Sequence, residues 1–122
     1  MPKKLGIREK CNVLLVNAPD RFERKLEPMP AGAEIISDPR RAQIAVLFVL
    51  SQAELARDFR PLVKVLQERT PLWMAWPKKA SGVRTDVTEN IVREFGLAHD
   101  LVDYKVCAID ETWSGLCFAR KR

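Results

Sequence analysis

One run of eight residues limits the fold of this chain more than any other feature. Gln43 to Leu50 (QIAVLFVL) is apolar after its first residue, which is typical of a strand buried on both faces of a sheet. Ser51 follows at once and Glu54 stands three residues later, a spacing that predicts a capping box at the start of a helix. A buried strand that leads directly into a helix is the repeating unit of α/β folds with parallel sheets.

The rest of the chain alternates in the same way. Further strands are predicted at 12–17, 34–37 and 71–76, and further helices at 20–27 and from residue 85. Residues 102–121 have the pattern of two strands joined by a tight polar turn, which predicts a closing hairpin. Pro61 cannot occupy a helix interior without the loss of a hydrogen bond, so we expect a break or kink near Arg60. The 122 residues therefore predict one α/β domain over 1–122, with a mostly parallel sheet and helices on both faces.

Charge and cysteine usage bear on the possible partners. The net charge is +5, and basic residues cluster at 3–4, at 78–84 and at 120–122. Such clusters can attract phosphates or nucleic acid, but acidic residues interrupt most of the chain and no RNA-binding aromatic pattern accompanies them. The ends therefore predict solvated tails.

The three cysteines include no CxxC pair, and with a single histidine they predict no metal site. Cys107 and Cys117 would face each other across the hairpin if its turn centred on Thr112. We expect both to be small buried side chains in a reducing compartment. The longest apolar run, 44–50, is far short of the roughly 20 residues that cross a membrane, and a cytoplasmic protein is predicted.

The carboxyl ends of the strands are the predicted place for a ligand, because open parallel sheets bind ligands there. The segments at 17–20, 38, 51, 76–86 and 110–115 would converge at this edge, and they are also the most polar parts of the chain. We therefore predict a ligand site with these members: Asn17, Asp38, Trp76, Lys78, Lys79, Ser81, Thr85, Asp86, Asp110, Glu111 and Trp113.

The segment 78–84 (KKASGVR), which we call the basic loop, permits two interpretations. It leads into a helix N-terminus, where free amides favour an anion, so it could form a cradle for a phosphate or carboxylate. Alternatively, its lysines pair with Asp110 and Glu111 across the top of the sheet, while Asp86 and Glu89 cap their own helix. The sequence leaves both open.

No catalytic residue is predicted. Trp76 and Trp113 could stack on a flat ligand or pack over the edge of the core. Asp110 and Glu111 are neighbours in a solvated turn, whereas acid–base catalysis needs two carboxylates in separate roles. His99 falls at the far end of a helix, away from the predicted site, so no nucleophile has a histidine beside it.

The order of elements resembles the class I S-adenosylmethionine-dependent methyltransferase fold. That family closes its sheet with a hairpin whose last strand inserts beside the penultimate parallel one, as 101–110 and 116–121 would do here. The resemblance implies a three-layer, Rossmann-like sheet of six strands in the order 2-1-3-4-6-5, and it implies that Asp38 matches the acidic residue that holds the cofactor ribose. The family's glycine-rich loop is replaced by Asn17-Ala18-Pro19-Asp20, so no cofactor is expected.

A small bacterial family, described only as a domain of unknown function, is similar over longer stretches. The similarity lies in VLLVNAPDRF (13–22), WPKKASGVRTDVTE (76–89) and VDYKVCAIDETWSGLCF (102–118). The family has no established activity, so this resemblance implies a fold and not a function.

These observations predict a non-catalytic binding or regulatory module for a small anionic ligand or an acidic protein segment. The alternatives are a methyltransferase with an atypical cofactor loop and a nucleic-acid-binding protein. The oligomeric state stays open, although an exposed second strand at the sheet edge would be a natural surface for self-association.

Overall fold

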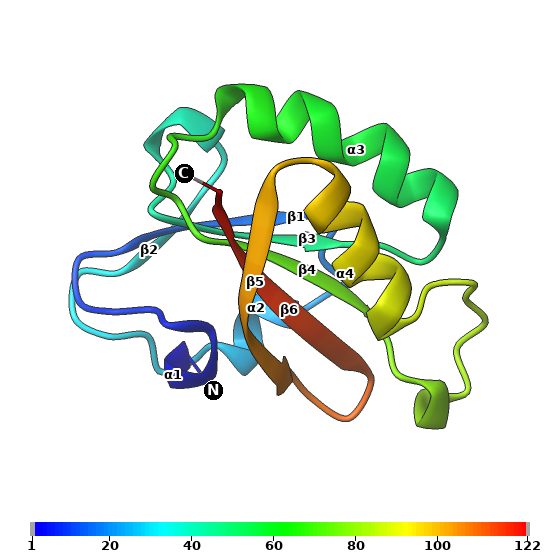
Figure 1. Ribbon diagram of the computed structural model, residues 1–122. Coiled ribbons are helices and arrows are strands. Elements are labelled where there is room, and N and C mark those ends of the chain that lie inside the picture. Colours follow the sequence, from blue (N-terminus) through cyan, green and yellow to red (C-terminus); the bar gives the residue numbers. More distant parts are fainter. Residues whose placement is uncertain (1, 122) are drawn as a thin grey trace.

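The structure, a computed structural model, describes residues 2–121, and its central feature is a six-stranded sheet in the order β2-β1-β3-β4-β6-β5 (Figure 1). This is the strand order that the resemblance to the methyltransferase fold implied. The strands are β1 (Asn12–Val16), β2 (Glu34–Ile36), β3 (Ile44–Phe48), β4 (Leu72–Pro77), β5 (Leu101–Ala108) and β6 (Trp113–Arg120).

The prediction of a mostly parallel sheet is wrong, because the sheet is mixed. Strands β2, β1, β3 and β4 pair in parallel, whereas β6 is antiparallel both to β4 and to β5. The physical reason is the short connection between β5 and β6. A tight turn can join only antiparallel neighbours, since a parallel pair needs a crossover of a dozen or more residues.

Helices cover the two faces of this sheet unequally. The helices are α1 (Pro2–Leu5), α2 (Phe22–Lys25), α3 (Gln52–Val65) and α4 (Glu89–Ala98). The two long ones, α3 and α4, pack on one face, while α1 and α2 are single turns that lie at the other (Figure 1). Within residues 2–121, no helix is both long enough and apolar enough to cross a membrane.

The core follows from the alternation of side chains along the strands. All five residues of β3 are buried, as expected for a central strand. On β4, Leu72, Met74 and Trp76 pack under α3 and α4, whereas Trp73 and Ala75 point to the opposite face. Each face thus has its own apolar cluster, and the sheet separates the two.

Helix α3 continues through Pro61, so a break near Arg60 is wrong, while the kink stays a prediction. Proline removes one backbone donor, which leaves the carbonyl of Arg57 without its usual partner. Pro61 lies on the exposed side of α3, where water can satisfy that carbonyl. Leu55, Phe59 and Leu62 on the buried side hold the helix against the sheet.

The hairpin differs from its predicted geometry at one point. Cys107 pairs with Gly115, and Cys117 pairs with Lys105, so the two cysteines are not directly opposite each other. The strands also shift register between Asp103 and Lys105, which leaves Tyr104 as an additional residue on β5. This β-bulge was not predicted, since an inserted residue has no signal in the alternation of a strand that is largely exposed.

Candidate functional site

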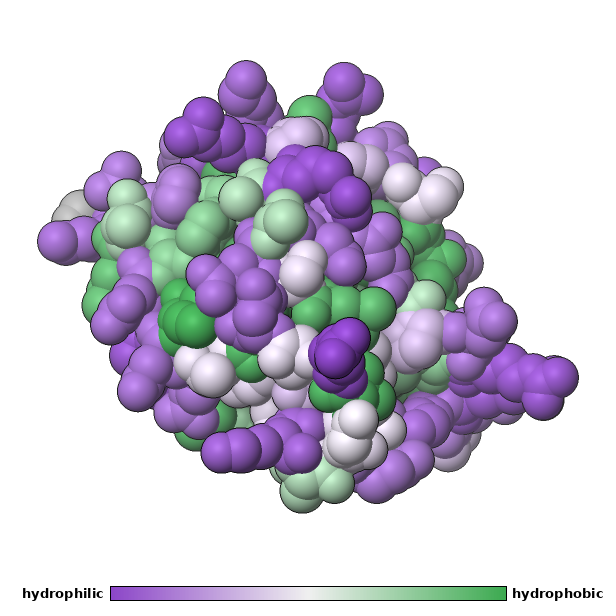
Figure 2. All heavy atoms as spheres, turned by 90° about the vertical axis from the view of Figure 1, so that its right-hand side faces the viewer, coloured by the Kyte–Doolittle hydropathy of each residue, from purple (hydrophilic) through white to green (hydrophobic). Residues whose placement is uncertain are grey.

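The predicted loops gather at one edge of the sheet. The register places Val16 beside Leu47, and Phe48 beside Ala75, so β1, β3 and β4 end together. Strand β6 starts at the same edge because Trp113 pairs with Pro77. Figure 2 shows this side of the molecule, where hydrophilic residues cover most of the surface.

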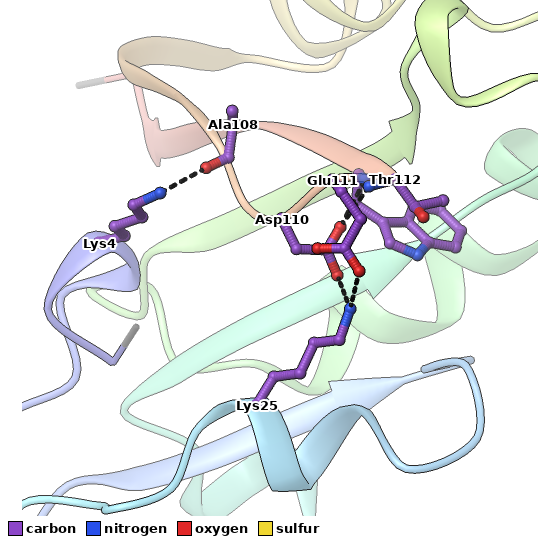
Figure 3. A network of polar contacts seen from close by, with 7 residues as sticks. Lys4, Lys25, Ala108, Asp110, Glu111 and Thr112 are labelled. Atoms are coloured by element: carbon purple, nitrogen blue, oxygen red, sulfur yellow. Dashed lines mark hydrogen bonds and ion pairs between the residues drawn. The ribbon is translucent and has the colours of Figure 1, made fainter.

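An ion-pair network occupies the turn between β5 and β6 (Figure 3). Lys25 Nζ of α2 lies 2.8 Å from Asp110 Oδ2 and 2.9 Å from Glu111 Oε1. The other oxygen of Asp110 accepts hydrogen bonds from the amides of Thr112 at 2.8 Å and Trp113 at 2.7 Å. Lys25 therefore takes the place that the alternative interpretation assigned to the lysines of the basic loop, and that interpretation is wrong.

The network keeps Asp110 charged at neutral pH. Its side chain is 6% exposed, and burial by itself disfavours the ionised form. The hydrogen bonds from Lys25 and from the amides of Trp113 and Thr112 outweigh burial, so the pKa of Asp110 lies below its usual value. The pKa of Lys25 is raised, first by its hydrogen bond to Asp110. Asp110 is thus a fixed acceptor that shapes the turn, not a group poised to exchange a proton.

The two tryptophans do not form a stacking site. Trp76 is 5% exposed and packs under α3 and α4, whereas Trp113 is 7% exposed and packs on the opposite face. The ring of Trp113 meets Phe48 edge-on, with the centroids 5.1 Å apart. Trp113 pairs with Pro77, so its side chain lies on the same face as that of Pro77. Trp76 is the residue before Pro77, and successive residues of a strand point to opposite faces. Both tryptophans are therefore core residues.

Thr85 and Asp86 connect the end of the basic loop to the start of α3. Asp86 Oδ1 accepts a hydrogen bond of 2.8 Å from the amide of Gln52, and the Gln52 side chain returns one of 3.0 Å to the Asp86 carbonyl. The Thr85 hydroxyl donates to the carbonyl of Leu50 at 2.6 Å. The carboxylate of Asp86 therefore stabilises the N-terminus of a helix that is distant in sequence.

The expected caps of α4 are wrong in detail. Thr88 is its N-cap, and the Thr88 hydroxyl accepts a hydrogen bond of 3.3 Å from the amide of Ile91. Glu89 instead pairs with Arg93 one turn further on, at 3.0 Å. Asp86 is not available to this helix because it is bound to α3.

The side chains of Asn17 and Asp38 both form hydrogen bonds within the protein. Asn17 has a left-handed backbone, with φ of 59°, and its amide group donates to Asp58 at 2.8 Å. The Asp38 side chain accepts from the amide of Arg40 at 3.0 Å and so caps the turn that follows β2. Strand β2 is three steps along the sheet from β4, or about 14 Å, so Asp38 is distant from the basic loop.

The basic loop is held by its backbone. The amide of Lys78 donates to the carbonyl of Thr112 at 2.7 Å, and the Ser81 hydroxyl donates to the carbonyl of Lys78 at 2.6 Å. The side chains of Lys78, Lys79 and Arg84 form no ion pair with any residue in 2–121. Their positive charges are therefore available to a partner.

Two features of the structure escaped the sequence analysis. Lys25 is the centre of the acidic network, yet it stands 85 residues before Asp110 and no local pattern connects them. Two hollows, of about 480 and about 900 Å³, lie at the edge opposite the predicted site. None of the predicted site residues lines either of them.

Comparison with protein-family models gave no match, and comparison with curated proteins gave none either.

Proposed function

We propose that this protein is a non-catalytic binding module that holds an acidic segment of a partner protein against the basic loop. The observation that carries the proposal is the absence of an intramolecular ion pair at Lys78, Lys79 and Arg84 within residues 2–121. Asp110 and Glu111, in the neighbouring turn, both pair with Lys25 and not with the basic loop. Three cations on one short loop are therefore left to attract an anionic partner.

The shape of the loop favours a protein segment over a small anion. The connection between β4 and α4 extends away from the body of the molecule at the right of Figure 1. A small ligand is held by a concave pocket, whereas an extended acidic segment can lie along an exposed loop. Exposed ion pairs contribute only about 0.2–1 kcal/mol each, so three of them support a weak complex that salt disrupts.

The two alternatives have less support. Nucleic-acid binding needs a continuous basic surface, but Arg120 donates to the carbonyls of Val63 and Leu66 at the far end of α3. The 14 residues of α3 put that end roughly 20 Å from the edge with the basic loop. For a methyltransferase, the cofactor loop would be Asn17-Ala18-Pro19-Asp20, which offers no glycine for close backbone approach.

The test compares two double variants with the same change in net charge. Lys78→Glu with Lys79→Glu alters the basic loop, and Lys3→Glu with Lys64→Glu alters exposed lysines elsewhere. The probe is a fluorescein-labelled octaglutamate peptide, and fluorescence anisotropy is recorded at low and at physiological salt. We expect the loop variant to weaken binding at least about tenfold and the control variant to change it less than about threefold.

An equal loss in both variants would contradict the proposal, because net charge and not the loop would then explain binding. Thermal unfolding of each variant shows whether a loss of binding reflects a loss of fold. Single-stranded DNA of matched charge and S-adenosylmethionine serve as further ligands. Tighter binding of DNA than of the peptide would favour the nucleic-acid alternative, and stoichiometric calorimetric binding of S-adenosylmethionine would favour the methyltransferase.

A further inference from the structure

A cleft of about 480 Å³ lies at the edge of the sheet opposite the basic loop. Its walls come from the segment that precedes β1 and from β5. Its floor is apolar and consists of side chains that are each 9% exposed or less: Leu5, Cys11, Ile44, Trp73 and Cys117. The volume is within the range of sites that bind small molecules, which is about 300–1,000 Å³.

The bulge in β5 determines what faces this cleft. Asp103 pairs with Phe118 and Lys105 pairs with Cys117, so Tyr104 is inserted between two regular pairs. In a regular strand, Tyr104 and Lys105 would point to opposite faces. Here both lie over the same face, because the thiol of Cys117 donates to Tyr104 Oη at 3.3 Å and Lys105 Nζ lies 5.8 Å from the centre of the Trp73 ring. Bulges are frequent beside binding sites, where they redirect side chains.

The wall of the cleft is rich in hydrogen-bond donors. Tyr104 Oη lies 3.3 Å from Cys117 Sγ, and a phenol hydroxyl both donates and accepts, so it can donate to a ligand when the thiol is the donor of that contact. A phenol keeps its proton at neutral pH, because the ordinary pKa of tyrosine is about 10. Lys105 and Arg8 add two cations that form no ion pair within residues 2–121, and Glu9 is the one carboxylate among the lining residues described. The lining therefore carries an excess of positive charge.

We propose that this cleft binds a small organic acid with an apolar body. The carboxylate of the ligand accepts hydrogen bonds from Lys105 and Tyr104, and its apolar body lies against the floor around Ile44. This site is separate from the basic loop and does not depend on the proposed binding of an acidic protein segment.

The test uses 4-phenylbutyrate and its neutral counterpart 4-phenylbutanol as probes, and protein-detected NMR measures their binding. The indole N–H of Trp73 reports on the cleft directly, since it donates to the carbonyl of Leu5 at the cleft wall. Lys105→Gln removes the positive charge and Tyr104→Phe removes the hydroxyl donor, and Lys79→Gln on the basic loop is the matched control. We expect chemical-shift changes at Trp73 and along β5, and tighter binding of the acid than of the alcohol. Lys105→Gln should bind the acid at least about fivefold more weakly, which is equivalent to about 1 kcal/mol of binding free energy.

Three outcomes would overturn the proposal: no binding of 4-phenylbutyrate at millimolar concentration, shifts confined to the basic loop, or equal affinities for the acid and the alcohol. The spectrum of each unliganded variant reports whether it is folded. If Lys105→Gln proved unfolded, Tyr104→Phe would decide, because it keeps the ring and removes only the hydroxyl. An unchanged affinity in a folded Tyr104→Phe would then refute the donor assignment.

Discussion

Replacement of Gly96 by alanine sets two opposing effects against each other within α4. Alanine is favoured over glycine in a helix interior by about 1 kcal/mol, so helix propensity alone predicts a gain in stability. The structure predicts a loss of stability instead. A Cβ atom at position 96 would lie 2.2 Å from Cε2 and 2.8 Å from Cδ2 of the Phe118 ring.

The expected magnitude follows from the space around that ring. Ordinary contact would require Phe118 to move away by about 1 Å, but its side chain is completely buried within the cluster under α3 and α4. Insertion of a methyl group into a packed core costs about 1–3 kcal/mol, and occasionally more. Because this contact is far below van der Waals distance, we place the cost of the added methyl group at the upper end of that range. After the gain in propensity is subtracted, Gly96→Ala should destabilise the protein by about 2 kcal/mol.

Urea denaturation followed by circular dichroism measures this free energy, and Phe118→Leu supplies the second arm of a double-mutant cycle. The smaller leucine removes the ring that Cβ would strike. Gly96→Ala should therefore cost much less in the Phe118→Leu background than in the wild type. A midpoint for Gly96→Ala equal to or above that of the wild type would refute the reasoning, as would an equal cost in both backgrounds.

Two further predictions concern the polar contacts. Lys25→Met leaves the largely buried Asp110 without its cation and should destabilise the fold by about 1–2 kcal/mol at neutral pH. The control, Lys79→Met, should change the free energy of unfolding by less than about 0.5 kcal/mol. The pKa of Asp110 is depressed, so this contribution is present above about pH 4 and is lost as the pH falls through the folded pKa. The pKa of Lys25 is raised, so at alkaline pH the contribution is lost only as the pH rises through that raised pKa. A difference between Lys25→Met and the wild type that stays constant down to acid pH in urea titrations would contradict the assignment. Thr88→Ala removes the N-cap of α4 and should cost about 1 kcal/mol in the same assay, with no cost if another group takes over the cap.

The elements that were predicted correctly have local causes. Ser51 and Glu54 were identified as a cap from spacing alone, and the amide of Glu54 indeed donates to the Ser51 hydroxyl at 3.1 Å. The apolar run at 43–50 contains β3, which is buried along its whole length. Capping and burial patterns act over a few residues, so they can be read along the chain.

The elements that were wrong have non-local causes. Pro61 is tolerated within α3 because one side of that helix faces water and the other packs on the sheet. The faces to which Trp76 and Trp113 point depend on the register between β4 and β6, in which a shift of one residue exchanges the two sides. Neither fact can be read from the residues around each position.

The chain's own pattern was sufficient to predict its strands, the capped start of α3 and the edge of the sheet at which the polar loops meet. Only the folded molecule decided which charges pair, as Lys25 reaches Asp110 across 85 residues while Lys78 and Lys79 form no ion pair among residues 2–121. Secondary structure depends on backbone geometry and burial within a short window, whereas an ion pair depends on a separation of a few ångströms that packing alone establishes.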